Sequence, residues 1–482
     1  MMDPRFKEVL EEARRRVDDY KKLGVNPLAL ATGCAVKVDL ERVVYPALSR
    51  LKRTLRGNVE IAPREDADLI EAPKGGVEVV RKIYPLENPE SMNESEVREL
   101  SGSHVIVLIQ VHQRHAFDEE SFYARIAPFY KRLERSGGKF YIGKGHSIVT
   151  PFEGDEFILM DFVRVSGEEP DGFTAVNNDT IHIIDPTADP TDYRQVAGAL
   201  NNSLNDVYVM GATEDVTIAP VVNAPTEEVR EMLEANVERY SREFGAKVLP
   251  LARPKRGRLL LGATVMAFTD RTPPIFYDRV KPGDKVLVTR PIGELAPINV
   301  FLAAVMDDRV VDDLEEYGIS GEEVLEAKEK AFNTIAKSNR EAGRVIAKYL
   351  PRYGEEFRDG EHIYATIDVT GPGVYVVWEL AMNAKAHIKL WEIPLLYPKF
   401  SRYATDRYLM LNATAGTNGA FIILAPDSIA ESIVKDLRAL GYPASVIGEV
   451  VDVGSPRVEA PKELAEYVAD KRVLEKFTLM GS

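Results

Sequence analysis

The sequence predicts an α+β protein with more than one domain. Stretches with the 3.6-residue apolar period of amphipathic helices alternate with short apolar runs that have the length of buried strands. Neither an early Gly-x-Gly-x-x-Gly loop nor a Walker loop is present, which argues against a Rossmann or P-loop fold. A length of 482 residues with 45% hydrophobic content allows about two to four domains with large cores.

The N-terminal third is expected to contain two helices followed by a block of different character. Apolar residues recur at helical spacing over residues 4–22, and a second helix is expected at 39–55. After residue 56 the pattern changes, and an almost unbroken apolar run at 105–111 indicates a buried strand. We therefore expect residues 56–154 to form an inserted subdomain.

The remaining elements alternate in type along the chain. In order, we expect strands at 157–165 and 180–184, a helix at 193–210, a strand at 216–222, a helix at 226–244, strands at 259–268 and 285–289, helices at 321–349 and 373–383, a strand at 420–425 and a helix at 428–440. We expect two further domains, 155–280 and 281–482, after an N-terminal segment at 1–55.

Composition excludes several classes of partner and site. The excess of 76 acidic over 61 basic residues gives a net charge of −15, which opposes binding to nucleic acid. No run approaches the roughly 20 apolar residues of a membrane span, and the charged N-terminus is unlike a signal peptide, so we expect a cytoplasmic protein with no membrane partner. One cysteine, Cys34, excludes an internal disulfide and a cysteine-rich zinc site within one chain.

Four segments place an aspartate at an expected strand end or helix start. These residues are Asp161, Asp179, Asp206 and Asp368. Carboxylates gathered from such positions would suit Mg²⁺, which binds a few carboxylates while ATP phosphates complete its shell. The alternative interpretation of each aspartate is a helix cap or a turn residue.

The segment that begins at Asp368 carries more information than the other three. Residues 368–373 read Asp-Val-Thr-Gly-Pro-Gly after an expected strand. Thr370 adds a hydroxyl, and Gly371 and Gly373 permit the backbone to approach a phosphate closely. The combination predicts a nucleotide-binding turn.

Several motifs resemble those of selenophosphate synthetases, which belong to the aminoimidazole ribonucleotide synthetase (PurM-like) superfamily. Residues 368–373 are similar to the family's Asp-Val-Thr-Gly-Phe-Gly, and residues 202–211 resemble its Asn-Ala-Leu-Ser-Asp-Val-Tyr-Ala-Met-Gly helix. Residues 281–293, between them, resemble the segment that joins the family's two domains. The family's Gly-Gly-His-Ser/Thr turn, expected near residues 261–265, has lost its histidine here.

The loop 33–37, Gly-Cys-Ala-Val-Lys, resembles the catalytic Gly-Cys-x-Cys/Sec-Lys loop of that family. The resemblance implies that Cys34 and Lys37 form the catalytic pair. A thiol is a soft nucleophile able to carry a chalcogen, and a nearby lysine lowers its pKa and neutralises phosphate charge. The other interpretation of Cys34 is a small buried hydrophobic residue.

The resemblance implies a PurM-like two-domain fold, with a ferredoxin-like mixed-sheet N-domain, an α/β C-domain and ATP between them. It also implies a homodimer, Mg²⁺ on Asp161, Asp179, Asp206 and Asp368, a phosphate contact from Asn202 or its neighbour Asn201, and K⁺ as an optional assisting ion. The expected reaction converts ATP and selenide into selenophosphate, AMP and phosphate. Two alternatives remain open at this point: a related ATP-dependent kinase or synthetase acting on sulfide or another small acceptor, and a non-catalytic nucleotide-binding regulator.

Overall fold

The computed structural model describes residues 4–22, 45–55, 59–61, 172–181, 183–249 and 259–481, together with scattered positions between 120 and 159. Cys34, Lys37 and Asp161 lie outside the described residues, and so do most of the block 56–154 and the expected strand at 105–111. Between residues 59 and 159 the structure describes two short pairs of strands, β1 (Val59–Ile61) with β2 (Phe140–Ile142) and β3 (Val149–Thr150) with β4 (Ile158–Leu159), the last of which lies just after that block.

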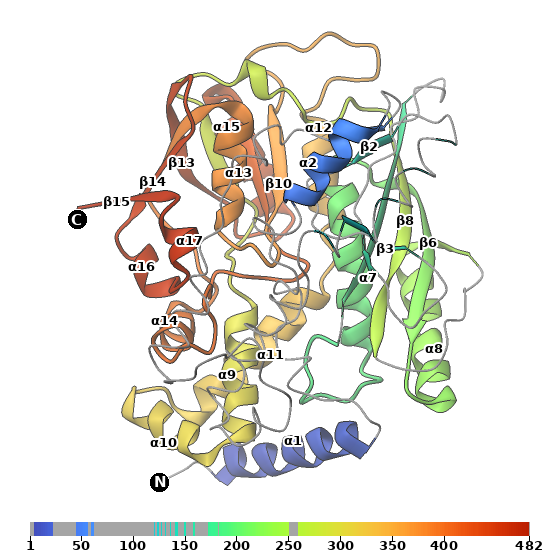
Figure 1. Cartoon of the computed structure of the whole chain (residues 1–482), viewed down its shortest axis with the longest axis vertical. Helices are drawn as coiled ribbons and strands as arrows, with labels where there is room; N and C mark the ends of the chain where they lie inside the picture. The colour runs from blue at the N-terminus through green and yellow to red at the C-terminus, as the bar shows by residue number, and fades with distance from the viewer. Residues whose placement is uncertain are drawn as a thin grey trace.

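The described chain is an α+β structure with two larger sheets of mixed strand direction, which confirms the predicted class (Figure 1). The first sheet has four strands in the order β5-β8-β6-β7. Its strands are β5 (Phe173–Ile181), β6 (Glu214–Asn223), β7 (Lys247–Val248) and β8 (Leu260–Thr269). All contacts in this sheet are antiparallel except the short β6–β7 pair, which is parallel.

Two helices accompany this first sheet. They are α7 (Tyr193–Tyr208) and α8 (Glu227–Phe244). Thr226 caps the start of α8 through its side chain, and Gly245 ends the helix in the left-handed conformation. In α7, 13 of the 16 residues are buried, because the helix lies between the sheet and α11. A helix covered on both sides places its polar residues inside the protein.

The second sheet has seven strands in the order β10-β12-β9-β13-β11-β14-β15. Its strands are β9 (Lys285–Val288), β10 (Ala365–Asp368), β11 (Ala386–Leu390), β12 (Phe421–Ala425), β13 (Ser445–Val453), β14 (Arg457–Pro461) and β15 (Phe477–Met480). Every residue of β12 is buried, as expected for a strand with a neighbour on each side and a covered sheet.

The helices of the second unit surround this sheet and extend below it (Figure 1). They are α9 (Leu295–Met306), α10 (Asp308–Glu316), α11 (Gly321–Ala336), α12 (Arg340–Lys348), α13 (Tyr375–Ala384), α14 (Pro398–Asp406), α15 (Asp427–Ala439), α16 (Leu464–Tyr467) and α17 (Lys471–Leu474), with a short 3₁₀ turn η5 (Tyr277–Arg279). None of the helices in the described part of the chain is both long and apolar enough to cross a membrane.

The two sheets share one hydrophobic core. A single cluster of buried side chains runs from Leu204 on α7 through Phe301 on α9 and Phe332 on α11 to Phe421 on β12. A second cluster covers the other face of the seven-stranded sheet, under α13. Because the first cluster is continuous, α7 is held against both units.

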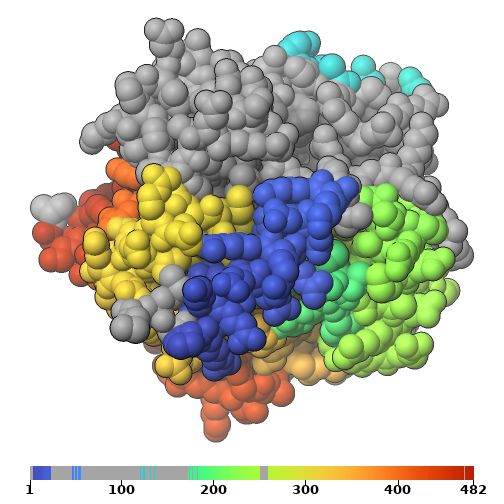
Figure 2. All heavy atoms as spheres, turned by 90° about the horizontal axis from the view of Figure 1, so that it is seen from below, coloured from blue at the N-terminus to red at the C-terminus, as the bar shows by residue number. Residues whose placement is uncertain are grey.

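The N-terminal helices are α1 (Pro4–Lys22) and α2 (Tyr45–Thr54). Figure 2 shows α1 along one face of the molecule beside the α9–α10 segment. Phe6 packs against Phe301 with 6.4 Å between ring centroids, and the Tyr20 hydroxyl donates to the Ala188 carbonyl at 3.1 Å. The helix therefore contacts both the C-terminal helices and the loop that precedes α7.

Two of the sequence predictions need correction. The single helix expected at 321–349 is two helices, α11 and α12, separated at Lys337–Asn339, because side-chain amides from elsewhere take the carbonyls that would continue it. The strand expected at 180–184 begins earlier and ends at Ile181, after which Asp185 starts a tight turn. In addition, α9 was not predicted, since an almost wholly apolar helix has no polar face to reveal its period.

Candidate functional site

Three of the predicted aspartates come together with three asparagines, and each carboxylate accepts a hydrogen bond from one asparagine amide. Asp179 lies on β5, Asp206 lies near the end of α7, and Asp368 is the last residue of β10. The site therefore lies where α7 passes between the two sheets.

The first pair joins β5 to α7. The Asn202 amide donates to Asp179 Oδ2, while Asn202 Oδ1 accepts from the Asn418 backbone N–H at 3.0 Å. Ser203, next on the helix, donates its hydroxyl to the Asp179 carbonyl at 2.9 Å. Both Asp179 and Asn202 are buried, so the amide replaces water as the donor to this carboxylate.

The second pair also joins β5 to α7, but here the asparagine donor is on β5 and the aspartate acceptor is on α7. Asn177 Nδ2 donates to Asp206 Oδ2 at 2.8 Å and to the Ser203 carbonyl at 2.9 Å. Asn177 and Asp179 are two residues apart on a strand, so their side chains are on the same face of the sheet. That face is the one that α7 covers, because both residues bond to it.

The third pair joins α7 to the second sheet. Asn205 Nδ2 donates to Asp368 Oδ2 at 3.1 Å. Burial raises the pKa of Asp368 from its ordinary 3.8 to about 6, with a further rise from the nearby Glu379 charge, while hydrogen bonds from Asn205 and Asp206 act in the opposite direction. Two carboxyl groups in hydrogen-bond contact need a proton or a cation between them.

Further asparagines connect the three pairs to the C-terminal unit. Asn339 Nδ2 donates to Asn205 Oδ1 at 2.8 Å and to the Gly419 carbonyl at 2.9 Å. Asn418 Nδ2 donates to the carbonyls of Ile335 at 2.6 Å and Lys337 at 2.8 Å, at the end of α11. The orientation of the site carboxylates thus depends on where α11 ends.

The adjoining Asn201 is turned the other way. Its Nδ2 donates to the Ala336 carbonyl at 2.8 Å, and its Oδ1 accepts from the Tyr240 hydroxyl at 2.6 Å. The register therefore places Asn202, and not Asn201, beside the carboxylates.

The predicted turn after Asp368 is tightly folded. Gly373 has φ +59°, and the Gly373 N–H donates to the Thr370 carbonyl at 2.9 Å. The same carbonyl accepts from the Gly416 N–H at 3.1 Å, and the Val374 N–H donates to Thr414 Oγ1 at 2.9 Å. Gly371 is buried in the turn. These bonds hold the turn close to the 414–419 loop.

Glycine is required at one position in that loop. A Cβ on Gly419 would lie 1.4 Å from the Val369 carbonyl oxygen, so no other residue fits without moving the backbone. The close approach brings the Gly419 carbonyl to the amides of Asn205 and Asn339. Backbone of the C-terminal unit thereby becomes part of the site.

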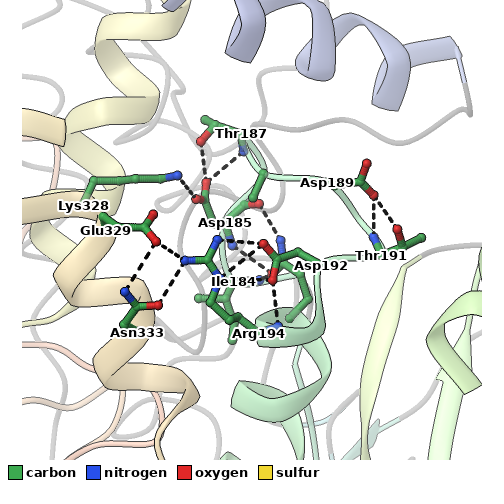
Figure 3. Close-up of polar contacts among 12 residues, drawn as sticks. Ile184, Asp185, Thr187, Asp189, Thr191, Asp192, Arg194, Lys328, Glu329 and Asn333 are labelled. Carbon is green, nitrogen blue, oxygen red and sulfur yellow. Dashed lines mark hydrogen bonds and ion pairs between the residues drawn. The ribbon is translucent and has the colours of Figure 1, made fainter. Parts of the chain in front are cut away.

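A second polar cluster, at the start of α7, sets the position of that helix (Figure 3). Asp185 is fully buried and pairs with Lys328 of α11 at 2.6 Å, while the Thr187 N–H and hydroxyl donate to its other oxygen. Arg194 bonds to its neighbour Asp192 and to Glu329 of α11. The N-terminal end of α7 is thus fastened to α11 by ionic contacts.

Of the predicted site residues, Asp206 and Asp368 lie within hydrogen-bond contact of each other, with the turn 370–373 following Asp368 directly, while Asp179 is joined to the same helix through Asn202. Within the described ranges, no three or more His, Cys, Asp or Glu side chains are grouped so as to hold a metal ion unaided. Asp161, Cys34 and Lys37 cannot be placed, since they lie outside those ranges.

Sequence reasoning missed Asn177, Asn205, Asn339 and Asn418. Two of them had a detectable signal. Asn177 is two residues before Asp179 on a strand, and Asn205 is three residues after Asn202 on a helix, so each shares a face with a predicted residue. No local pattern marks Asn339 or Asn418, which reach the site only through the tertiary fold.

No family model and no curated protein matches this sequence. Among solved structures, the chain is similar to protein tt0281 from Thermus thermophilus, with 14% identity, 62% of this chain and 88% of that chain covered, and a TM-score of 0.45. It is also similar to thiamine-monophosphate kinase from Stenotrophomonas maltophilia K279a, with 16% identity, 70% of this chain and 95% of that chain covered, and a TM-score of 0.43. A third similar structure is the hydrogenase maturation protein HypE of E. coli, with 19% identity, 60% of this chain and 83% of that chain covered, and a TM-score of 0.41. Likenesses this weak leave the family of the chain open.

Proposed function

We propose that this chain is an ATP-dependent, Mg²⁺-using phosphoryl-transfer enzyme of the PurM-like superfamily, with selenophosphate synthetase as its nearest functional type. The observation that carries the proposal is the contact between Asp206 and Asp368, each held by an asparagine amide, directly before the glycine turn 370–373. Asp179 is held by Asn202 of the same helix as Asp206. The residue resemblance in these same segments supports the choice of chemistry.

The donor set fits magnesium better than a transition metal. Its atoms are carboxylate oxygens, which a hard cation prefers, and Mg²⁺ is commonly bound through one or two carboxylates with phosphates and water completing the shell. Bound Mg²⁺ would neutralise charge on the phosphates. In this proposal Asp161 is the fourth carboxylate.

The protein's own groups would orient the nucleotide. Thr370, Gly371 and Gly373 lie in a turn whose backbone can approach a phosphate, and Asn202 supplies an amide at the same place. Asp368, with its pKa raised to about 6, is ionised above neutral pH and is then available to a cation.

The acceptor in this proposal is selenide. ATP, selenide and water give selenophosphate, AMP and phosphate, with Cys34 carrying the chalcogen and Lys37 neutralising the transferring phosphoryl group. K⁺ would be the monovalent cation. Sulfide or another small acceptor is the alternative. The proposal also includes the domain boundaries 1–55, 56–154, 155–280 and 281–482, a cytoplasmic location and a two-fold homodimer, which light scattering tests.

The deciding experiment is ³¹P NMR of ATP incubated with protein and Mg²⁺, with selenide, with sulfide or with neither. Selenophosphate, AMP and phosphate in the selenide arm alone support the full proposal. A thiophosphate product, or ADP with a different acceptor, keeps the enzyme class and changes the substrate. If no arm consumes ATP although ATP binds, the chain is a nucleotide-binding regulator and the enzymatic proposal is wrong.

A further inference from the structure

Of the three asparagines that donate to the site aspartates, Asn177 is the one whose oxygen has no hydrogen-bond partner within the described residues. Its side chain is 1% exposed, and its Nδ2 already makes two hydrogen bonds, to Asp206 and to the Ser203 carbonyl. Within the described part of the chain, Asn177 Oδ1 has no hydrogen-bond partner. A buried amide oxygen left in this way costs about 1–3 kcal/mol, so proteins rarely keep one without a use.

The other two asparagines do not share this feature. Asn202 Oδ1 accepts from the Asn418 N–H, and Asn205 Oδ1 accepts from Asn339 Nδ2. The oxygens of both amides therefore already have a hydrogen-bond partner. Asn177 alone holds its carboxylate while its oxygen stays open.

The orientation of the Asn177 amide follows from its neighbours. Both groups within reach of Nδ2 are acceptors, the Asp206 carboxylate and the Ser203 carbonyl. Rotating the amide by 180° would set its oxygen against two oxygens and leave the N–H₂ group without partners. The open position is thus an oxygen, the atom type that a cation binds.

We infer that Asn177 is a ligand of the cation bound by Asp206 and Asp368, and that it also positions Asp206 through its Nδ2. This inference rests on the proposed function and adds to it a neutral oxygen donor on β5. The chemistry suits a hard divalent ion, which takes amide carbonyl oxygens together with carboxylates. A neutral ligand also adds no charge repulsion where two carboxyl groups are in hydrogen-bond contact.

The test measures cation binding and not turnover. Mn²⁺, a paramagnetic substitute for Mg²⁺, is titrated at pH 8 into the full-length protein, in the absence and presence of ATP, and free Mn²⁺ is read by EPR. Asn177→Leu, which has a similar shape but no oxygen, should weaken Mn²⁺ binding by about tenfold or more. Asn177→Asp, which keeps an oxygen, should bind Mn²⁺ at least as tightly as the unaltered protein.

Asn223 provides a matched control in the same sheet. Its Oδ1 is also buried without a partner among the described residues, but it is five positions along β6 from Ile218, the residue in line with Asn177 across β8. That offset is about 17 Å along the strand. Asn223→Leu should leave Mn²⁺ affinity unchanged, and thermal melting of each variant reports whether it folds.

The outcomes separate this inference from the proposed function. Unchanged Mn²⁺ affinity in Asn177→Leu, with normal binding by the unaltered protein, overturns the ligand role and leaves the function standing. Equal weakening in Asn177→Leu and Asn223→Leu also overturns it, since the effect would then be general. If Asn177→Leu does not fold, tight binding by Asn177→Asp supports the role and a tenfold loss contradicts it. If the unaltered protein binds no Mn²⁺ even with ATP, the proposed function itself fails.

Discussion

Asn205 on α7 donates a hydrogen bond to Asp368 at the end of β10, 3.1 Å away, and so joins the helix that covers the first sheet to an edge strand of the second. The carboxylate receives this bond in a buried setting, with its pKa raised to about 6. Residues of both units therefore form the site, and the charge on the Asp368 carboxyl group affects the stability of the folded protein.

Asp368→Asn should stabilise the protein at pH 8. The folded-state pKa of about 6 lies above the ordinary 3.8, so folding favours the protonated form and stability is lost as pH rises between these two values. At about 1.4 kcal/mol per pKa unit, the loss is at most about 3 kcal/mol, and asparagine avoids it. Urea unfolding at pH 8 and pH 4 checks this: the gain should be present at pH 8 and absent at pH 4. A gain of equal size at both pH values would contradict the ionisation account.

Asp206→Asn should abolish Mg²⁺-dependent ATP turnover and leave the fold intact. In the proposed site, one carboxylate fewer leaves phosphate charge under-neutralised. A coupled ATPase assay over a range of Mg²⁺ concentrations measures the effect. Asp278→Asn, at a carboxylate whose side chain is 80% exposed, is the control and should match the unaltered enzyme. Near-normal turnover in Asp206→Asn would exclude this residue from the magnesium site.

Lys328→Met should destabilise the protein by about 3–5 kcal/mol, because it leaves the fully buried Asp185 carboxylate without its cation. Lys348 is a matched control, since it pairs with Asp436 at the same 2.6 Å but its side chain is 61% exposed. Lys348→Met should cost under about 1 kcal/mol. Chemical denaturation measures both. An equal loss of unfolding free energy in the two variants would contradict the claim that burial makes the Lys328–Asp185 pair more important for stability.

Gly419→Ala should disrupt the site, because its Cβ would lie 1.4 Å from the Val369 carbonyl oxygen and the 414–419 loop would have to move. The comparison is Gly441→Ala, where φ is +82° but no atom lies within 4 Å of the added carbon. There the cost is only backbone strain, about 1–2 kcal/mol. Mn²⁺ affinity should fall in the first variant alone. Retained affinity in Gly419→Ala would mean that the loop does not define the site.

Cys34→Ser and Lys37→Ala should retain ATP binding and lose selenide-dependent turnover, since in the proposed reaction both residues act on the transition state. The two should differ in side reactions. Cys34→Ser keeps slow hydrolysis of ATP by water, whereas Lys37→Ala loses it with the phosphate contact. ATP titration and ³¹P product analysis separate these effects. Unchanged product formation in Cys34→Ser with every chalcogen donor would make the thiol structural and favour another acceptor.

The sequence by itself determined the elements whose signal is local. The amphipathic period of residues 4–22 and 226–244 and the apolar runs at 216–222 and 259–268 produced the helices and strands expected there, because burial of one face needs only that spacing. The sequence also identified Asp179, Asp206, Asp368 and Asn202 as candidate site residues, because they lie in segments whose order along the chain matches the motifs of one family. Helix α9 escaped detection because burial on all sides removes the polar face that marks a period.

Only the tertiary structure decided how those residues are held. Within residues 321–349, Ser338 and Asn339 are residue types that favour a helix start, but they did not outweigh the helical period. Helix α11 ends at Ala336, where amides of Asn201 and Asn418, distant in sequence, take the carbonyls of the last turn. The pairing of each aspartate with one asparagine likewise depends on α7 lying between two sheets. A hydrogen bond between distant residues forms only once the fold brings the groups to about 3 Å, so no local pattern could predict it.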